Sequence, residues 1–291
     1  SGAEPAALLM ITLVLSLMIT YAIAQVLISS NRTSVTSDGM SQSQETGRFV
    51  MSYLANNIRQ AGQNSTTIGG PTTDTFVSCT DFPGLMDFNT PGNHQCTFET
   101  AIGGTQLNIN NLANAGDRLA IAHIPVVPLN AAVPPVADPD LIRDCTGAGG
   151  YAAEEIILNV FWVAPDGNGM NSLFCQGHTF NGNDIVLPSN PAQAIANGVE
   201  AIHMLYGFAD NPLGATGDRN VTRYINAGAV PAGQWDQVYS VKVSILTRSI
   251  TGVTNQTALR SYVLSDAAPY LMTDAASRQV FNTSFVINNY R

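Results

Sequence analysis

AALLMITLVLSLMITYAIAQVLI, residues 6–28, is the stretch that decides the fold of this 291-residue chain. No charged side chain occurs from Pro5 to Asn31, and about 20 helical residues are enough to cross the hydrocarbon core of a bilayer. Pro5 suits the first turn of a helix, where its missing N–H costs nothing, and Glu4 complements the helix dipole. The stretch therefore predicts a helix that is apolar on every side.

A secretory signal peptide is the main competing interpretation of this segment, and three features argue against it. No basic residues precede the apolar run, the run is too long, and the given sequence starts at Ser1 rather than Met. We therefore expect a chain whose N-terminus has been processed and whose apolar segment is kept.

The helical pattern continues past Asn31 but becomes amphipathic. Val50, Leu54, Ile58 and Ala61 recur at helical spacing and define one apolar face. The polar side is marked by Arg48, Asn56, Arg59 and Gln60. Because Gly62 follows as a C-cap, a single helix is expected from about residue 5 to about residue 61.

This asymmetry divides the chain into 1–31, an apolar membrane or filament-core segment, 32–62, an amphipathic half-helix, and 63–291, a β-rich globular head. A soluble domain is expected to pack on 32–62, whereas 1–31 must contact lipid or other copies of itself. Hydropathy alone leaves a single-span membrane anchor and a filament core equally open.

After Gly62, loops rich in Gly, Pro, Asn and Thr alternate with short β-type runs. Strands are expected near Leu107 and Leu119. The longer candidates are EIILNVFWVA (155–164), SLFCQG (172–177), EAIHMLYGF (200–208), QVYSVKVSILTRS (237–249) and QVFNTSFVIN (279–288). The first two of these are expected to form a hairpin through PDGNGMN (165–171), and the proline-rich stretch 130–140 to form an exposed loop.

The segment VYSVKVSIL (238–246) has the period-2 alternation of a strand with two distinct faces. One face is expected to carry Val238, Ser240, Lys242 and Ser244, and the other Tyr239, Val241, Val243 and Ile245. We expect the second, apolar row to pack against the amphipathic half of the helix. The predicted fold is therefore α+β, with a long N-terminal helix on an antiparallel sheet and long loops.

The chain is acidic and sparsely charged, with a net charge of −9 and only 11% charged residues. An acidic surface repels phosphate backbones, so nucleic acid is not expected as a main partner. Low charge together with many small polar residues is typical of an exported, mostly β protein.

Four cysteines, Cys79, Cys96, Cys145 and Cys175, are widely spaced and form no CxxC motif. Their even number and an exported context predict two disulfides, for which the sequence allows three pairings. We favour Cys79–Cys96 and Cys145–Cys175, because each closes a shorter loop.

No catalytic constellation is recognisable, and we expect a protein that is not an enzyme and needs no cofactor. The four histidines, His94, His123, His178 and His203, form neither an HExxH motif nor an i,i+4 pair, and there is no nucleophile elbow or P-loop. We expect His123 and His203 to be structural or surface residues of strands.

Weak calcium candidates are Asp166, Asn168, Asp210 and Asp218, which lie in two Asn- and Gly-containing segments. Neither segment completes an EF-hand pattern, and polar turns explain both more simply. We therefore predict no metal site.

The segment QETGRFVMSYLANNIRQAG (44–62) resembles the conserved helix of PilW-type proteins, which are large members of the type IV pilin and pseudopilin group. Further pieces follow in the order of that family: GDRLAIAH (116–123), RDCTGA (143–148), ILNVFWVAP (157–165), LFCQG (173–177), NGVEAIHMLYGF (197–208), WDQVYSVKVSILTRS (235–249) and RQVFNTSFVINNYR (278–291). Each piece is short, but their order and spacing make the set fairly specific.

The resemblance implies a structural subunit of an extracellular type IV pilus-like filament, either its repeating subunit or a minor initiating pilin. It implies removal of a leader by a prepilin peptidase, a methylated N-terminus, and residence in a bacterial inner membrane until an assembly machinery lifts the subunit into the filament at the cell surface. Its partners would be other copies of itself, other pilins and that machinery.

Ser1 and Glu4 are the residues that the resemblance points to for assembly. Pilins usually carry a hydrophobic first residue and a glutamate at the fifth position, which pairs with the N-terminal amine of a neighbouring subunit. Here Glu4 is the only acidic residue near that position, and the first residue is Ser1.

The alternative is a membrane-tethered surface adhesin or binding module, with loops 72–93 and 126–140 as its binding surface.

Overall fold

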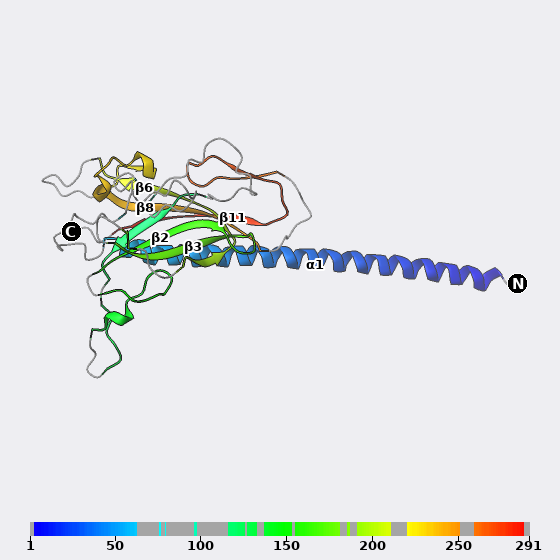
Figure 1. Ribbon diagram of the computed structural model, residues 1–291. Helices are drawn as coiled ribbons and strands as arrows, with labels where there is room; N and C mark the ends of the chain where they lie inside the picture. The colour runs from blue at the N-terminus through cyan, green and yellow to red at the C-terminus, as the bar shows by residue number, and fades with distance from the viewer. Residues whose placement is uncertain are drawn as a thin grey trace.

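The computed structural model consists of one long helix and a β-rich head that lies on the C-terminal half of that helix (Figure 1). It describes residues 3–62, 76, 79, 96–97, 116–125, 127–132, 137–152, 155–180, 185–186, 191–210, 220–250 and 259–287. This architecture confirms the predicted α+β class.

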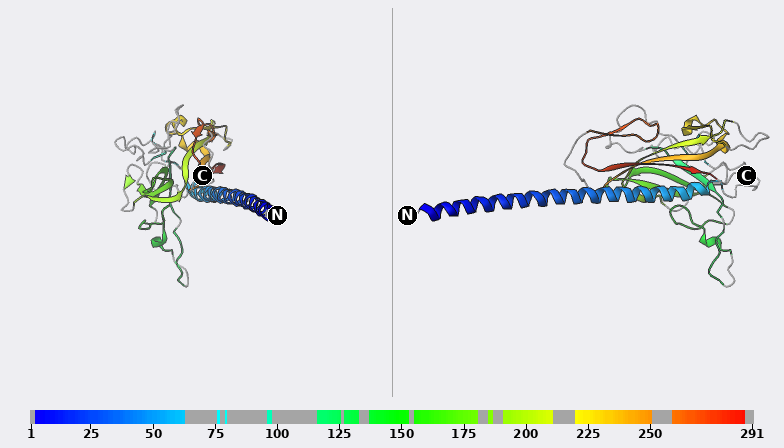
Figure 2. Two further views of the ribbon diagram at one scale, coloured as in Figure 1. Left: turned by 90° about the vertical axis from the view of Figure 1, so that its right-hand side faces the viewer. Right: turned by 180° about the vertical axis from the view of Figure 1, so that it is seen from behind.

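Helix α1 runs from Ala3 to Gln60 without interruption. Its 58 residues correspond to a rod of roughly 87 Å. The N-terminal half projects away from the head, as the two further views in Figure 2 show. The expected limits of about residue 5 and about residue 61 are therefore confirmed within the usual uncertainty of helix ends.

Two antiparallel sheets form the body of the head. The first has the order β1-β2-β3-β4, with β5 also paired to β3, and the second has the order β11-β8-β6-β7. A two-stranded ribbon, β9 and β10, accompanies the second sheet. The strands are β1 Leu119–His123, β2 Ile156–Pro165, β3 Asn171–Phe180, β4 Ile185–Val186, β5 Gln193–Asn197, β6 Val199–Phe208, β7 Arg223–Ile225, β8 Val238–Arg248, β9 Arg260–Tyr262, β10 Tyr270–Met272 and β11 Arg278–Val286. Short 3-10 turns are η3 Pro139–Leu141, η4 Ala227–Ala229 and η5 Trp235–Gln237.

The longer predicted strands are all present, and β2 and β3 form the predicted hairpin in full register from Ile156↔Phe180 to Pro165↔Asn171. The candidate strand near Leu107 lies outside the described residues, and so does the loop 72–93 apart from Phe76 and Cys79. The described part of the loop 130–140 is largely exposed, as expected.

The main core lies between the amphipathic half of α1 and both sheets. Val50, Leu54, Ile58 and Ala61 are completely buried, as the helical spacing predicted. They belong to one apolar cluster with residues of both sheets. The first sheet contributes Ile121 of β1 and side chains of β3, and the second contributes side chains of β6 and β8. Each fully buried aliphatic side chain of this kind contributes about 1.5–3 kcal/mol of transfer free energy, so this face holds the head on the helix.

The C-terminal end of α1 is closed by Gly62, which has a positive φ of 69°. Its N–H donates to the carbonyl oxygen of Ala122 in β1 at 3.0 Å. The predicted glycine cap is therefore confirmed, and it also fixes the first sheet to the helix end.

The apolar row of β8 follows the prediction except at its start. Val241, Val243 and Ile245 are fully buried in the cluster that contains the helix face. Val238 also joins this cluster, whereas Tyr239 does not, so the assignment of these two residues was wrong. The reason is a bulge: Gly207 pairs with Ser240 and the next β6 residue pairs with Val238, so the alternation of β8 shifts by one position.

The opposite face of the second sheet is covered by the segment around β9 and β10. Leu264, Tyr270 and Met272 pack there against Ala201 and Leu246. Alternation in β8 does not reveal this cover, because its residues lie at large sequence distance from the strand.

Candidate functional site

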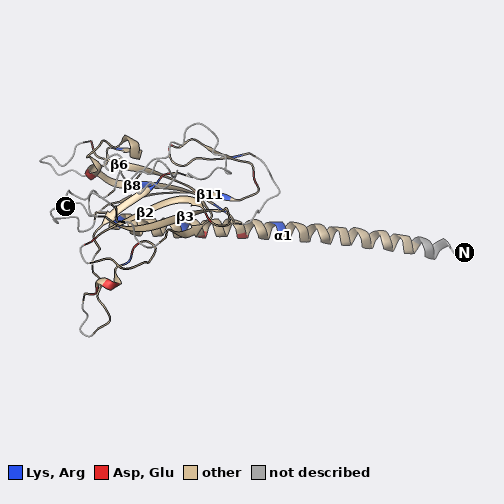
Figure 3. Cartoon of the chain, in the orientation of Figure 1, with Lys and Arg blue, Asp and Glu red and all other residues tan. Residues whose placement is uncertain are grey.

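The exposed half of α1 is the first candidate site. Its large apolar side chains from Leu8 to Ile28 keep 48–71% of their surface exposed. No charged side chain lies along this part until Arg32 (Figure 3). The helix is long and apolar enough to cross a membrane by length and composition. A surface of this kind requires lipid or another apolar helix as its environment.

Three hydroxyl groups on this half are satisfied within the helix itself. Thr12 donates to the Leu9 carbonyl oxygen at 2.9 Å, Ser16 donates to that of Leu13 at 2.9 Å, and Thr20 donates to that of Ser16 at 2.8 Å. Because these polar groups need no water, the segment is compatible with a low-dielectric environment.

A small-residue seam, Gly39, Ser43 and Gly47, begins the docked half of the helix, and all three residues are buried. A Cβ atom at position 47 would overlap the ring of Phe281 in β11, so glycine is required for this close approach. The Ser43 hydroxyl lies 2.8 Å from the hydroxyl of Thr247 in β8. The seam therefore fixes where along α1 the head is attached.

Of the two predicted assembly residues, only Glu4 is described, and it lies at the end of the helix that is far from the head. Glu4 belongs to the first turn of α1, whereas Ser1 lies outside the described residues. The structure contains one chain, so the roles of both residues stay predictions.

Both favoured disulfides, Cys79–Cys96 and Cys145–Cys175, are formed. The second connects the loop 143–148 to strand β3. In that loop the Asp144 carboxylate accepts hydrogen bonds from the Thr146 and Ala148 N–H groups at 2.7 and 3.0 Å. Asp144 also accepts one from the Tyr151 hydroxyl at 2.6 Å. Two of the sequence segments used for the resemblance, RDCTGA and LFCQG, are thus covalently joined.

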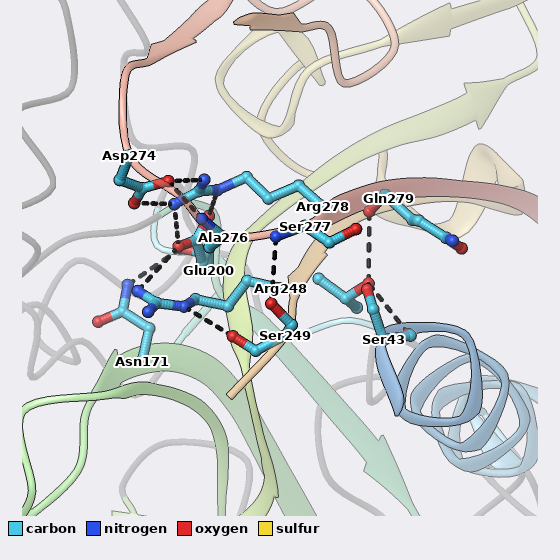
Figure 4. A network of polar contacts seen from close by, with 11 residues as sticks. Ser43, Asn171, Glu200, Arg248, Ser249, Asp274, Ala276, Ser277, Arg278 and Gln279 are labelled. Atoms are coloured by element: carbon cyan, nitrogen blue, oxygen red, sulfur yellow. Dashed lines mark hydrogen bonds and ion pairs between the residues drawn. The ribbon is translucent and has the colours of Figure 1, made fainter. Parts of the chain in front are cut away.

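A buried ionic cluster lies between the sheets, beside the seam (Figure 4). Arg278, whose side chain is 1% exposed, binds Glu200 through Nε–Oε2 at 2.5 Å and Nη2–Oε1 at 2.8 Å. It also binds Asp274 through Nη2–Oδ2 at 2.7 Å, and Arg248 lies 3.4 Å from Glu200. The cluster joins β6, β8 and β11 at one end of the second sheet.

The electrostatics of this cluster favour its ionised state. The hydrogen bond from Arg278 holds the pKa of Asp274 below its usual value, although burial opposes this. Burial alone would lower the pKa of Arg278, but the hydrogen bonds to Asp274 and Glu200 outweigh it and raise that pKa. We therefore interpret the cluster as a structural ion-pair network that holds β6, β8 and β11 together.

A second buried cluster places His203 between two carboxylates. Its Nδ1 lies 2.9 Å from Asp117, and its Nε2 lies 2.7 Å from Asp266. Burial lowers the pKa of His203, but the two carboxylates outweigh burial and raise the pKa to about 9. Ser244 of β8 is the residue paired with His203 of β6. Its hydroxyl forms a 2.5 Å hydrogen bond with the hydroxyl of Ser265.

This arrangement contains the residue types of a Ser–His–Asp triad but not its chemistry. A general base needs a ring nitrogen with a free lone pair facing the nucleophile, whereas both nitrogens of His203 face carboxylates. His203 thus has the structural position that we predicted for it.

Two other histidines, His123 and His178, are buried in the head. His123 and His178 are 6% and 1% exposed, and burial lowers the pKa of each to about 4. His94 lies outside the described residues. Within the described part of the chain, no group of three or more His, Cys, Asp or Glu side chains is placed to hold a metal ion.

The weak calcium candidates take part in local structure. Asp166 accepts hydrogen bonds from the N–H groups of Asn168 and Met170 at 2.8 and 2.9 Å, and so closes the β2–β3 turn. Asp210 forms an ion pair with Arg223 at 2.8 Å. Asp218 lies outside the described residues.

Sequence reasoning missed Glu200, Arg278 and Asp117 as buried charges. A signal was available for Glu200, which lies inside the otherwise apolar strand segment EAIHMLYGF. Its partners come from distant segments, so the pairing itself carried no sequence signal.

Residues 160–289, which begin in the middle of β2 and include all of β11, match the family model described as type IV pilus-assembly protein W. No curated protein and no solved structure matched the chain. The matched region holds strands β3–β11, Cys175 and the ionic cluster around Arg278. Residues 160–289 of the chain are therefore similar to type IV pilus-assembly protein W.

Proposed function

We propose that this chain is a structural subunit of a type IV pilus-like filament, assembled by packing of its N-terminal helices. The observation that carries the proposal is the division of α1 into a docked half with a fully buried face and an apolar half with no cover from the head. Before assembly, the apolar half would hold the subunit in a bacterial inner membrane. On assembly, it would exchange lipid for the same segments of other copies.

Helix packing of this kind has support in the residues of the exposed half. Ala22 and Ala24 leave space for close approach of a second helix, as small residues do in membrane helix pairs. The internally bonded hydroxyls of Thr12, Ser16 and Thr20 remove the need for polar partners. The surface therefore suits both lipid and a filament core.

Glu4 is the residue that we propose for register and recruitment. A carboxylate beside an apolar packing surface is costly unless it is paired, so a defined partner such as a neighbour's N-terminal amine would select one alignment of helices. This proposal follows the family resemblance and the position of Glu4 in the first turn of α1.

The experiment is to express the full chain with a type IV pilus assembly system, shear surface fibres from the cells, and identify their subunits by electron microscopy and mass spectrometry. We expect the chain in the sheared fibres, either along the length or at low copy number. Recovery only in membrane fractions would refute the filament role and support the tethered binding module.

The Glu4 role is tested in the same assay with Glu4→Ala and a control, Glu45→Ala. Glu45 is an exposed acidic residue of the docked half, so its removal changes the charge equally. We expect Glu4→Ala alone to lower fibre yield, while the subunit level in the membrane stays unchanged. Normal fibre yield in Glu4→Ala would show that Glu4 has no part in assembly.

A further inference from the structure

A cavity of about 250 Å³ lies beside the C-terminal end of α1, next to the end of β1 and to η3. It is at the end of the head that is farthest along α1 from the apolar half (Figure 1). Its walls mix apolar and polar groups. The lining residues are Gln60, His123, Pro125, Pro128, Leu141, Ile142 and Arg143.

His123, one of the lining residues, carries an unsatisfied polar atom. The residue is 6% exposed, and its Nδ1 is buried without a hydrogen-bond partner. Because burial lowers the pKa of His123 to about 4, the imidazole is neutral near pH 7. Leaving such a group unpaired costs about 1–3 kcal/mol, which a bound polar ligand would recover.

Arg143 brings a positive charge that the fold holds in place. Its Nη1 donates to the carbonyl oxygen of Ile142 at 2.8 Å and to that of Asp140. The guanidinium lies against Gly149, where an added Cβ would come within 3.1 Å of Cζ. Two backbone carbonyls and a glycine therefore fix the orientation of this side chain.

The charge of Arg143 is not neutralised within the part of the chain that the structure describes, because no described carboxylate forms an ion pair with it. By contrast, Arg223, Arg248 and Arg278 each have a carboxylate partner. In a chain with net charge −9, a positioned arginine without a carboxylate at a cavity is a recognition feature for an anion.

We propose that this cavity binds a small carboxylate with a short apolar tail. The carboxylate accepts hydrogen bonds from the Arg143 nitrogens that the backbone leaves open. The tail contacts Pro125, Pro128 and Leu141, and the His123 ring and the Gln60 amide supply further polar contacts. The volume suits a ligand of fewer than about ten non-hydrogen atoms, because drug-sized ligands occupy about 300–1,000 Å³. This site is independent of filament assembly.

The test uses the full chain in detergent micelles and 3-methylbutanoate as the probe, followed by saturation-transfer NMR. Its neutral isostere, 3-methylbutanamide, is the matched ligand control, and empty micelles correct for partitioning. We expect saturable binding of the carboxylate with half-saturation at about 1–10 mM, as the size of the probe allows. The amide should bind at least about tenfold more weakly, because it lacks the charge-assisted hydrogen bonds.

The variant is Arg143→Gln, and its control is Arg223→Gln, which removes the same charge from another exposed arginine. Arg143→Gln should weaken carboxylate binding by about tenfold or more, and Arg223→Gln should leave it unchanged. The proposal is overturned if the carboxylate does not saturate, if the amide binds equally well, or if both variants bind like the parent chain.

Discussion

Replacing Arg278 with methionine tests directly how the head is held together. The substitution removes both charge-assisted hydrogen bonds to Glu200, whose side chain is 3% exposed. Among the described residues, Glu200 then keeps Arg248, at 3.4 Å, as its one cationic partner. Removing one partner of a buried ion pair costs about 3–5 kcal/mol, because the other charge stays buried without compensation. We expect a loss of unfolding free energy in this range for Arg278→Met.

Glu200→Gln should cost less, about 2–3 kcal/mol, because Arg278 retains the partly exposed Asp274. The double variant Glu200→Leu with Arg278→Met should cost less than Arg278→Met alone, since it leaves neither charge of the pair unpaired. The assay is urea unfolding of the full chain in detergent micelles, followed by fluorescence of the buried Trp235.

Two results would refute this reasoning about the ionic cluster. The first is a cost below about 1 kcal/mol for Arg278→Met, which would mean that water reaches Glu200. The second is a Glu200→Leu/Arg278→Met double variant whose cost equals the sum of the costs of Glu200→Leu and Arg278→Met measured singly, which would mean that the charges do not interact.

Three further predictions concern other contacts of the head. Gly47→Leu should displace Phe281 and destabilise the helix–sheet contact by about 1–3 kcal/mol. The control Gly167→Leu lies in an open turn and should cost less. Hydrogen exchange of the backbone amides of residues 40–60 measures the stability of the contact. Because the pKa of His203 is raised to about 9 in the folded state, its stabilisation is fully present below about pH 6.5 and is lost as pH rises through 9. We expect this loss to amount to about 3 kcal/mol in the parent chain, and a pH dependence of the unfolding free energy that is unchanged in His203→Gln would contradict the assignment. Cys145→Ser with Cys175→Ser opens a link with a sequence separation of 30 residues, and denaturant unfolding should show a loss of about 3–4 kcal/mol.

Local patterns were sufficient to predict the framework of the fold. The spacing of Val50, Leu54 and Ile58 fixed the buried face of α1, because a helix repeats every 3.6 residues whatever it packs against. The hairpin of β2 and β3 was predictable for a similar reason, since its turn residues lie between two adjacent strands. The disulfide pairing followed from loop length.

Features that depend on distant contacts were not predictable. The bulge that exchanges Val238 and Tyr239 depends on the pairing with β6, about 30 residues earlier in the chain. The requirement for glycine at position 47 depends on Phe281, and the partners of Glu200 depend on how β6, β8 and β11 are ordered. In each case the local sequence does not indicate which distant residue makes the contact.

The spacing along α1 links the structure of the head to the proposed role of the apolar half. The first buried helix residue, Gly39, lies 11 positions after Ile28, so about 16 Å of helix separates the apolar segment from the head. The headgroup layer of one leaflet is about 5–8 Å thick, so this distance is enough for the head to clear a membrane surface. The connecting residues 29–38 are polar with the exception of Val35, and nearly all are exposed. Because α1 continues through them without a break, an alignment set by the apolar segments of neighbouring copies would be passed on to the heads through one rigid element.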